Sequence, residues 1–210
     1  MIKVKDGMTI VFIGDSITDW YRDMQNPLGH GFALMVSALL GAKHPDMTFN
    51  FVNTGVGRSK TGDILGRWKY DCLRHNPDVV IFLAGVNDCL EPLFVDEDKF
   101  PPSLVKDNMC KMLDTVKDKE IILLEPFLNV NIGKFANPWG LSKEWIDENL
   151  KPIQEVVREV AKKYNTYFIP LSEIFEDLCK YGPDKWTAEG CHPTEIGHGV
   201  ITNKILELFD

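Results

Sequence analysis

The segment Asp78-Val79-Val80-Ile81-Phe82-Leu83-Ala84 is almost entirely apolar and rich in β-branched residues. A continuous apolar run of this kind is typical of a strand in a parallel sheet, because helices cover both faces of such a sheet. A similar run at residues 9–13 ends at Gly14, where we expect a turn. Further strands are expected at 48–52, 120–124 and 167–169. The sequence therefore predicts five buried strands.

Segments with apolar residues at helical spacing lie between these strands. Helices are expected at 31–42, 61–75, 103–116, 142–164 with an interruption at Pro152, 172–179 and 193–209. Strands that alternate with helices favour an α/β fold, a three-layer α/β/α sandwich around a five-stranded parallel sheet. Because no repeat or linker divides the chain, we expect residues 1–210 to form one domain.

Composition excludes several classes of function. The formal net charge is −8, whereas a nucleic-acid partner requires a clustered Lys/Arg surface. No apolar run is long enough to span a bilayer, and the N-terminal residues lack the apolar core of a secretory signal. The five cysteines have neither C-x-x-C nor zinc-like spacing. We therefore expect a cytoplasmic protein with free thiols and no metal site. The alternative is a secreted protein whose signal has been removed.

The first chemical motif, Gly14-Asp15-Ser16, follows the first strand directly. Gly14 permits a tight turn that would present the Ser16 hydroxyl to a cleft, with backbone N–H groups directed at the same space. The alternative is that Asp15 or Ser16 only caps a helix, since both residue types are favoured caps. The segment by itself supports the two interpretations equally.

A second motif lies just before the final helix, where Glu189 precedes His192 by three residues. An acid at this spacing can hold the Nδ1 proton of the imidazole and leave Nε2 to act as a base. Asp184 or Glu195 could orient His192 instead. Together with Ser16, these residues form a candidate catalytic triad.

Two further segments place hydrogen-bond donors at strand ends. Gly55 follows the second strand and can offer its N–H, while Asn87 follows the third and can offer its side-chain amide. With the N–H of Ser16 they would surround a developing oxyanion. Each segment is also a plausible plain turn, because Asn and Gly are common in turns.

These motifs, in this order, resemble those of the SGNH subgroup of the GDSL-type esterases and lipases. The matching segments are Gly14-Asp15-Ser16, Gly55, Gly85-Val86-Asn87-Asp88 and His192-Pro193. The resemblance implies a flavodoxin-like fold and a serine esterase that needs no metal or organic cofactor. It also implies Ser16 as nucleophile, His192 as base, and Ser16, Gly55 and Asn87 as the oxyanion hole. Arg67-Trp68 and Gly197-His198 are similar to features of carbohydrate-esterase members, including acetylxylan esterases.

The chain departs from the family pattern at two places. Glu189 stands where the family usually has Asp, and Ser-His-Glu triads are chemically feasible. After Gly57, Arg58 puts positive charge at the predicted cleft rim. Two long connections, 85–101 and 126–141, follow strand ends where ligands bind in open α/β sheets. The candidate substrate contacts are Asp15, Arg58, Phe127 and Trp139.

The expected substrate is a small acyl ester, especially an acetyl ester of a carbohydrate, because the connections near the predicted cleft are polar and Asn-rich. Lysophospholipid, thioester and aryl-ester hydrolysis are alternatives on the same fold, as is a non-catalytic carbohydrate-binding protein on a decayed esterase fold. We expect a small-molecule ester partner, no nucleic acid and no integral membrane segment. A homo-oligomer is left open.

Overall fold

A computed structural model describes residues 1–94, 100–129 and 139–210. Its centre is a parallel sheet with strand order β2-β1-β3-β4-β5. The strands are β1 (Met8–Gly14), β2 (Phe49–Asn53), β3 (Val79–Leu83), β4 (Glu120–Leu124) and β5 (Tyr167–Ile169). β3 lies in the middle, with Val80 beside Val11 of β1 and Ile121 of β4. The predicted fold class and all five predicted strands are confirmed.

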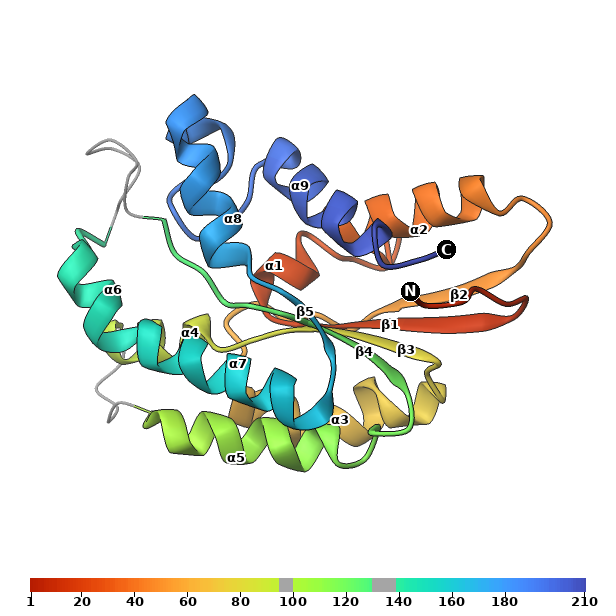
Figure 1. Ribbon diagram of the computed structural model, residues 1–210, viewed down its shortest axis with the longest axis horizontal. Helices are drawn as coiled ribbons and strands as arrows, with labels where there is room; N and C mark the ends of the chain where they lie inside the picture. Colours follow the sequence, from red (N-terminus) through yellow and green to blue (C-terminus); the bar gives the residue numbers. More distant parts are fainter. Residues whose placement is uncertain (95–99, 130–138) are drawn as a thin grey trace.

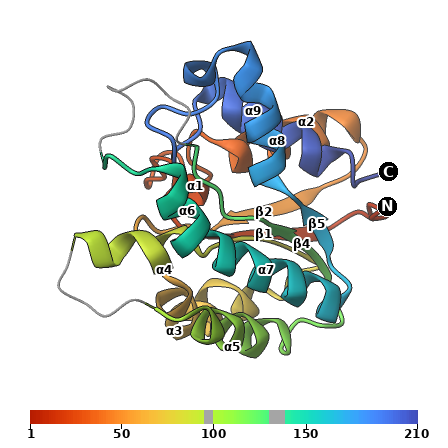
Figure 2. The same ribbon diagram turned by 60° about the vertical axis from the view of Figure 1, so that its left-hand side comes forward.

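Helices cover both faces of this sheet (Figures 1 and 2). The α-helices are α1 (Ser16–Asp19), α2 (Phe32–Lys43), α3 (Thr61–Asp71), α4 (Val86–Leu90), α5 (Pro102–Leu113), α6 (Lys143–Asn149), α7 (Lys151–Tyr164), α8 (Leu171–Leu178) and α9 (Glu195–Leu206). Short 3₁₀ segments are η1 (Leu73–His75), η2 (Glu91–Leu93), η3 (Cys179–Tyr181) and η4 (Pro183–Lys185). α2, α8 and α9 pack on one face, and α3, α5 and α7 pack on the other. The predicted interruption at Pro152 is confirmed, because α6 and α7 are separate helices.

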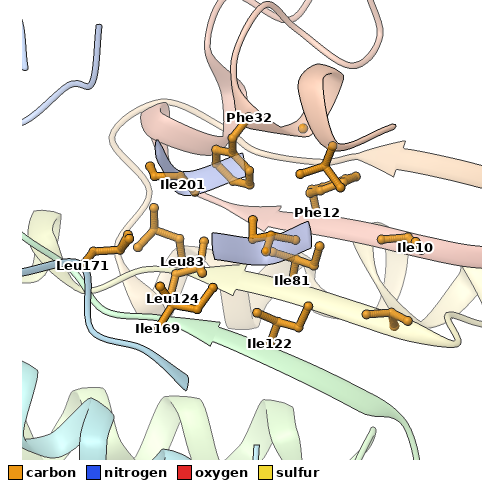
Figure 3. Packing of buried hydrophobic residues seen from close by; sticks show 14 of the residues in the cluster. Ile10, Phe12, Phe32, Ile81, Leu83, Ile122, Leu124, Ile169, Leu171 and Ile201 are labelled. Atoms are coloured by element: carbon orange, nitrogen blue, oxygen red, sulfur yellow. The ribbon is translucent and has the colours of Figure 1, made fainter. Parts of the chain in front are cut away.

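The core consists of two apolar layers, one on each side of the sheet. In the layer shown in Figure 3, Phe12 and Ile81 of the strands pack with Phe32 of α2 and Ile201 of α9. The opposite layer joins Val11 and other strand residues to α3, α5 and α7. Every residue of β3 is buried, which explains why its sequence is continuously apolar.

The long connection after β3, predicted over 85–101, has helical structure in its described part. It contains α4 and η2, which lie directly after the strand. Gly85 begins this segment with φ of 122°, a conformation that glycine adopts readily and other residues rarely do. Helices this short carry too little periodicity to be detected in the sequence. In the other long connection, residues 130–138 lie outside the described part of the structure.

Within the described residues, no helix has both the length and the apolar character needed to cross a membrane. The N- and C-terminal segments lie side by side, since Ile2 forms a β-bridge with Phe209 (Figure 1).

Candidate active site

The chemical motifs meet at the carboxyl edge of the sheet, where the strand order reverses around β1. Ser16 is the first residue of α1, directly after β1, and Asn87 lies in α4, directly after β3. Glu189 and His192 lie in the loop before α9. The topology of the sheet thus brings together residues from both ends of the chain.

Ser16, His192 and Glu189 form a hydrogen-bonded chain. Ser16 Oγ lies 2.8 Å from His192 Nε2, and His192 Nδ1 hydrogen-bonds to Glu189 Oε1. The same carboxylate oxygen accepts the backbone N–H of His192 at 3.2 Å. Asp184 and Glu195 are both exposed to solvent, and the acid that contacts the imidazole is Glu189. This arrangement can move a proton from the serine hydroxyl to the imidazole.

The loop that carries His192 is held at several points. Ala188 N–H donates to His192 O at 2.8 Å, and Asn129 N–H donates to Gly190 O at 2.7 Å. Gly190 has φ of 98°, which lets the chain turn between the acid and the histidine. These bonds fix the backbone on both sides of the imidazole, so the ring is positioned before any ligand arrives.

Opposing effects set the pKa of His192. Burial lowers it, but the hydrogen bond and charge of Glu189, with a smaller contribution from Asp15, outweigh burial and raise the pKa above its ordinary value. The carboxylates therefore stabilise the imidazolium that forms when His192 accepts a proton.

Asp15 lies beneath the site rather than on its surface. Its side chain is completely buried, and Oδ1 accepts the N–H of Ile17 at 3.0 Å, which caps α1. Among the described residues Oδ2 has no hydrogen-bond partner. Burial raises the pKa of Asp15 to about 7. The predicted contact between Asp15 and substrate is therefore wrong, because a fully buried carboxyl cannot reach a ligand.

The two predicted oxyanion donors outside α1 differ in their surroundings. The side-chain amide of Asn87 is buried and donates to Ser59 O at 3.2 Å. The N–H of Gly55 donates to Asn53 Oδ1 at 2.9 Å, so it is already engaged. A Cβ at Gly55 would lie 2.3 Å from Asp19 N, which shows that this glycine packs against the backbone of α1. This hydrogen bond does not fit the predicted oxyanion role of Gly55.

The three remaining predicted substrate contacts lie in different surroundings. Arg58 donates two hydrogen bonds of 2.8 Å to the Glu91 carboxylate and keeps most of its side chain exposed. Trp139 is half-buried and packs against the apolar cluster that contains Cys191. Phe127 is buried and stacks on Phe175 with ring centroids 4.4 Å apart. This core packing does not support the predicted contact between Phe127 and substrate, which stays a prediction.

Trp20 was not singled out by the sequence motifs. Its ring lies 5.8 Å from the His192 ring and 4.7 Å from the His198 ring, measured between centroids. His198 Nδ1 accepts the N–H of Phe32 at the start of α2, and burial lowers the pKa of His198 to about 3. A neutral His198 thus joins α9 to α2 and supports the tryptophan beside the catalytic histidine candidate.

Arg67 of α3 connects the end of β1 to the segment after β2. It donates to Gly14 O at 2.9 Å and to Thr54 O at 2.6 Å, and it forms an ion pair with Asp71. The sequence offered Arg67 only through the family resemblance, because nothing local indicates that its side chain reaches the end of β1.

Two other features are candidate ligand sites. A cavity of about 410 Å³ lies between α6, α7 and α8, and neither Ser16 nor His192 lines it. Within the described residues, Glu189, Cys191 and His192 form the single cluster of metal-ligating groups.

Comparisons with known proteins identify the family of the chain. A model of the GDSL-like Lipase/Acylhydrolase family matches residues 12–200. The chain is 25% identical to an acetylxylan esterase from Geobacillus stearothermophilus over 217 residues, which cover 98% of this chain and 95% of that protein. It is 26% identical to an arylesterase from Vibrio mimicus over 127 residues, covering 60% of this chain and 58% of that protein.

A solved structure shows the same similarity in three dimensions. The crystal structure of a putative GDSL-like lipase from Parabacteroides merdae superposes with a TM-score of 0.87 at 25% identity, covering 97% of this chain and 96% of that one. With the esterase relatives, these matches show a hydrolase that acts on carboxylic ester bonds. The chain therefore belongs to the GDSL-like lipase/acylhydrolase family.

Proposed function

We propose that the protein is a serine esterase in which Ser16, His192 and Glu189 act as a triad. Ser16 Oγ attacks the ester carbonyl while His192 Nε2 accepts the hydroxyl proton, and Glu189 stabilises the imidazolium. His192 then donates that proton to the leaving alcohol, and an acyl-enzyme remains. Water, activated by the same base, hydrolyses the acyl-enzyme and restores Ser16. The 2.8 Å contact between Ser16 Oγ and His192 Nε2 carries this proposal.

The N–H of Ser16 and the amide of Asn87 are the proposed oxyanion donors. Ser16 is the first residue of α1, and the first N–H groups of a helix have no partner within the helix. The hydrogen bond from Asn87 to Ser59 uses one of the two N–H groups of its amide. Gly55 is left out of this role, since its N–H bonds to Asn53.

The proposed substrate is an acetyl ester of a carbohydrate. The support comes from the acetylxylan esterase of Geobacillus stearothermophilus, which matches over nearly the whole chain, whereas the arylesterase matches over part of it. The Arg58–Glu91 ion pair adds a polar element in the loops after β2 and β3, which suits a hydroxyl-rich leaving group better than a long acyl chain.

Labelling by a fluorophosphonate probe tests the nucleophile. The wild type should be labelled and should cleave p-nitrophenyl acetate, and Ser16→Ala should lose both properties. A series of p-nitrophenyl esters of increasing acyl length, followed by acetylated xylo-oligosaccharides, then tests the substrate. Activity that peaks at octanoyl or longer esters would overturn the acetyl preference and leave the serine mechanism intact.

The choice of acid is tested by three matched variants. Glu189→Gln should lower kcat strongly, since the equivalent change in a well-studied serine protease lowers it ~10⁴-fold by favouring the wrong tautomer. Asp184→Asn and Glu195→Gln should retain activity, because both side chains are exposed. A collapse of activity in either of these two, with activity retained in Glu189→Gln, contradicts the proposed triad.

A further inference from the structure

Cys191 lies in the same loop as the proposed acid and base, but the proposed mechanism does not use it. Its side chain is buried and packs with Val86 and Leu90 of α4. Its Sγ, a carboxylate oxygen of Glu189 and a ring nitrogen of His192 all lie within 4.8 Å of one another. A thiol, a carboxylate and an imidazole therefore converge on one small volume.

These are the donor types that bind Zn²⁺. Zinc takes thiolate at about 2.3 Å, and imidazole and carboxylate at about 2.0–2.2 Å, which puts tetrahedral ligands roughly 3.5 Å apart. The three ligand atoms, within 4.8 Å of one another, would have to approach by at most about 1.3 Å to reach that spacing. Water would occupy the fourth position. Mg²⁺ and Ca²⁺ prefer oxygen ligands, so the thiol makes the cluster selective against them.

We propose that Glu189, Cys191 and His192 form an inhibitory binding site for Zn²⁺. The side chains of His192 and Glu189 are 31% and 21% exposed, so an ion can reach the cluster from solvent. The Glu189 carboxylate supplies negative charge to a cation at this position. The bound ion takes the place of the Cys191 thiol proton and separates Glu189 from His192.

Zinc binding at this cluster has two consequences. The Cys191 side chain binds the ion as a thiolate, so its proton leaves when the Zn–S bond forms. The ion also removes His192 from its contact with Glu189 and so blocks proton transfer from Ser16. Inhibition rests on the proposed function, whereas binding does not.

Binding is measured with Co²⁺, which occupies zinc sites and absorbs visibly. The wild type should give a thiolate-to-cobalt charge-transfer band in the near ultraviolet that Zn²⁺ abolishes. Cys191→Ala and Cys191→Val should lack the band, and Cys110→Ala, which removes a thiol on α5, should keep it. Absence of the band in the wild type would overturn the site whether or not the protein is an esterase.

Inhibition is measured on p-nitrophenyl acetate hydrolysis with Zn²⁺, with Mg²⁺ as the control ion. Zn²⁺ should inhibit the wild type and Cys110→Ala, and EDTA should restore activity. Loss of an outer-shell partner weakens metal binding ~10–100-fold, so loss of the Cys191 ligand should raise the inhibition constant at least ~10-fold. Equal inhibition of Cys191→Ala and the wild type, or cobalt binding without inhibition of an active enzyme, would contradict the proposal.

Discussion

Replacing Asp15 by Asn should make the free energy of unfolding less dependent on pH. Asp15 is completely buried, and one of its carboxylate oxygens has no partner among the described residues. Burial raises its pKa from 3.8 to about 7 in the folded protein. A group whose pKa is higher in the folded state contributes stability that is fully present below the unfolded pKa and is lost as pH rises through the folded pKa.

The size of the effect follows from that difference. About three pKa units correspond to roughly 4 kcal/mol of unfolding free energy, which the wild type should lose between about pH 4 and about pH 8. Asn cannot ionise, and its side-chain oxygen can still accept the Ile17 N–H that caps α1. The difference in stability between Asp15→Asn and the wild type should therefore increase in favour of the variant as pH rises.

Urea unfolding followed by tryptophan fluorescence measures this difference at several pH values. Asp184→Asn is the matched control, because it removes an exposed carboxylate. Parallel stability curves for the wild type and Asp15→Asn from about pH 4 to about pH 8 would refute the assignment of a buried carboxyl with a raised pKa beneath the site.

Three further changes test other contacts. In α9, a Cβ at Gly197 would lie 2.1 Å from Trp186 O, so Gly197→Ala should lower the unfolding free energy by about 1–3 kcal/mol. At Gly199 a Cβ would meet nothing within 4 Å, so Gly199→Ala should leave the unfolding free energy unchanged. Thermal unfolding measures both variants. Arg67→Gln removes hydrogen bonds to Gly14 O and Thr54 O and should lower kcat by up to ~10²-fold in steady-state assays. Lys69→Gln, on the exposed side of α3, should leave kcat unchanged. Glu189 raises the pKa of His192, and only the neutral imidazole acts as a base. In a pH profile, kcat/KM should therefore rise through a midpoint above 6.5. The residual activity of Glu189→Gln should show a lower midpoint.

The sequence determined the fold class because a strand that is buried on both faces of a sheet is continuously apolar, and such a run can be recognised in the local sequence. The continuous apolar run at β3 and the shorter runs at β1, β4 and β5 identified the strands, and helical periodicity identified most of the helices. The short α1 and α4 escaped prediction, since helices of four and five residues are too short to establish a period.

The sequence also indicated Ser16, His192 and Glu189, because each lies in a local motif whose residue types suit proton transfer. The contact between Ser16 and His192 has no local signature in the sequence. These residues are 176 positions apart, and only the convergence of β1 and the loop before α9 at one sheet edge places their side chains 2.8 Å from each other.

Tertiary structure alone decided which way side chains and N–H groups point. Asp15 and Phe127 are in predicted contact segments, yet both are buried, because packing against α1 and Phe175 provides them with an interior environment. The N–H of Gly55 turns to Asn53, and Arg67 reaches across to Gly14. Residue type and spacing determine which groups a chain possesses, but the direction of each group depends on neighbours from distant parts of the chain, and these are set only when the layers pack.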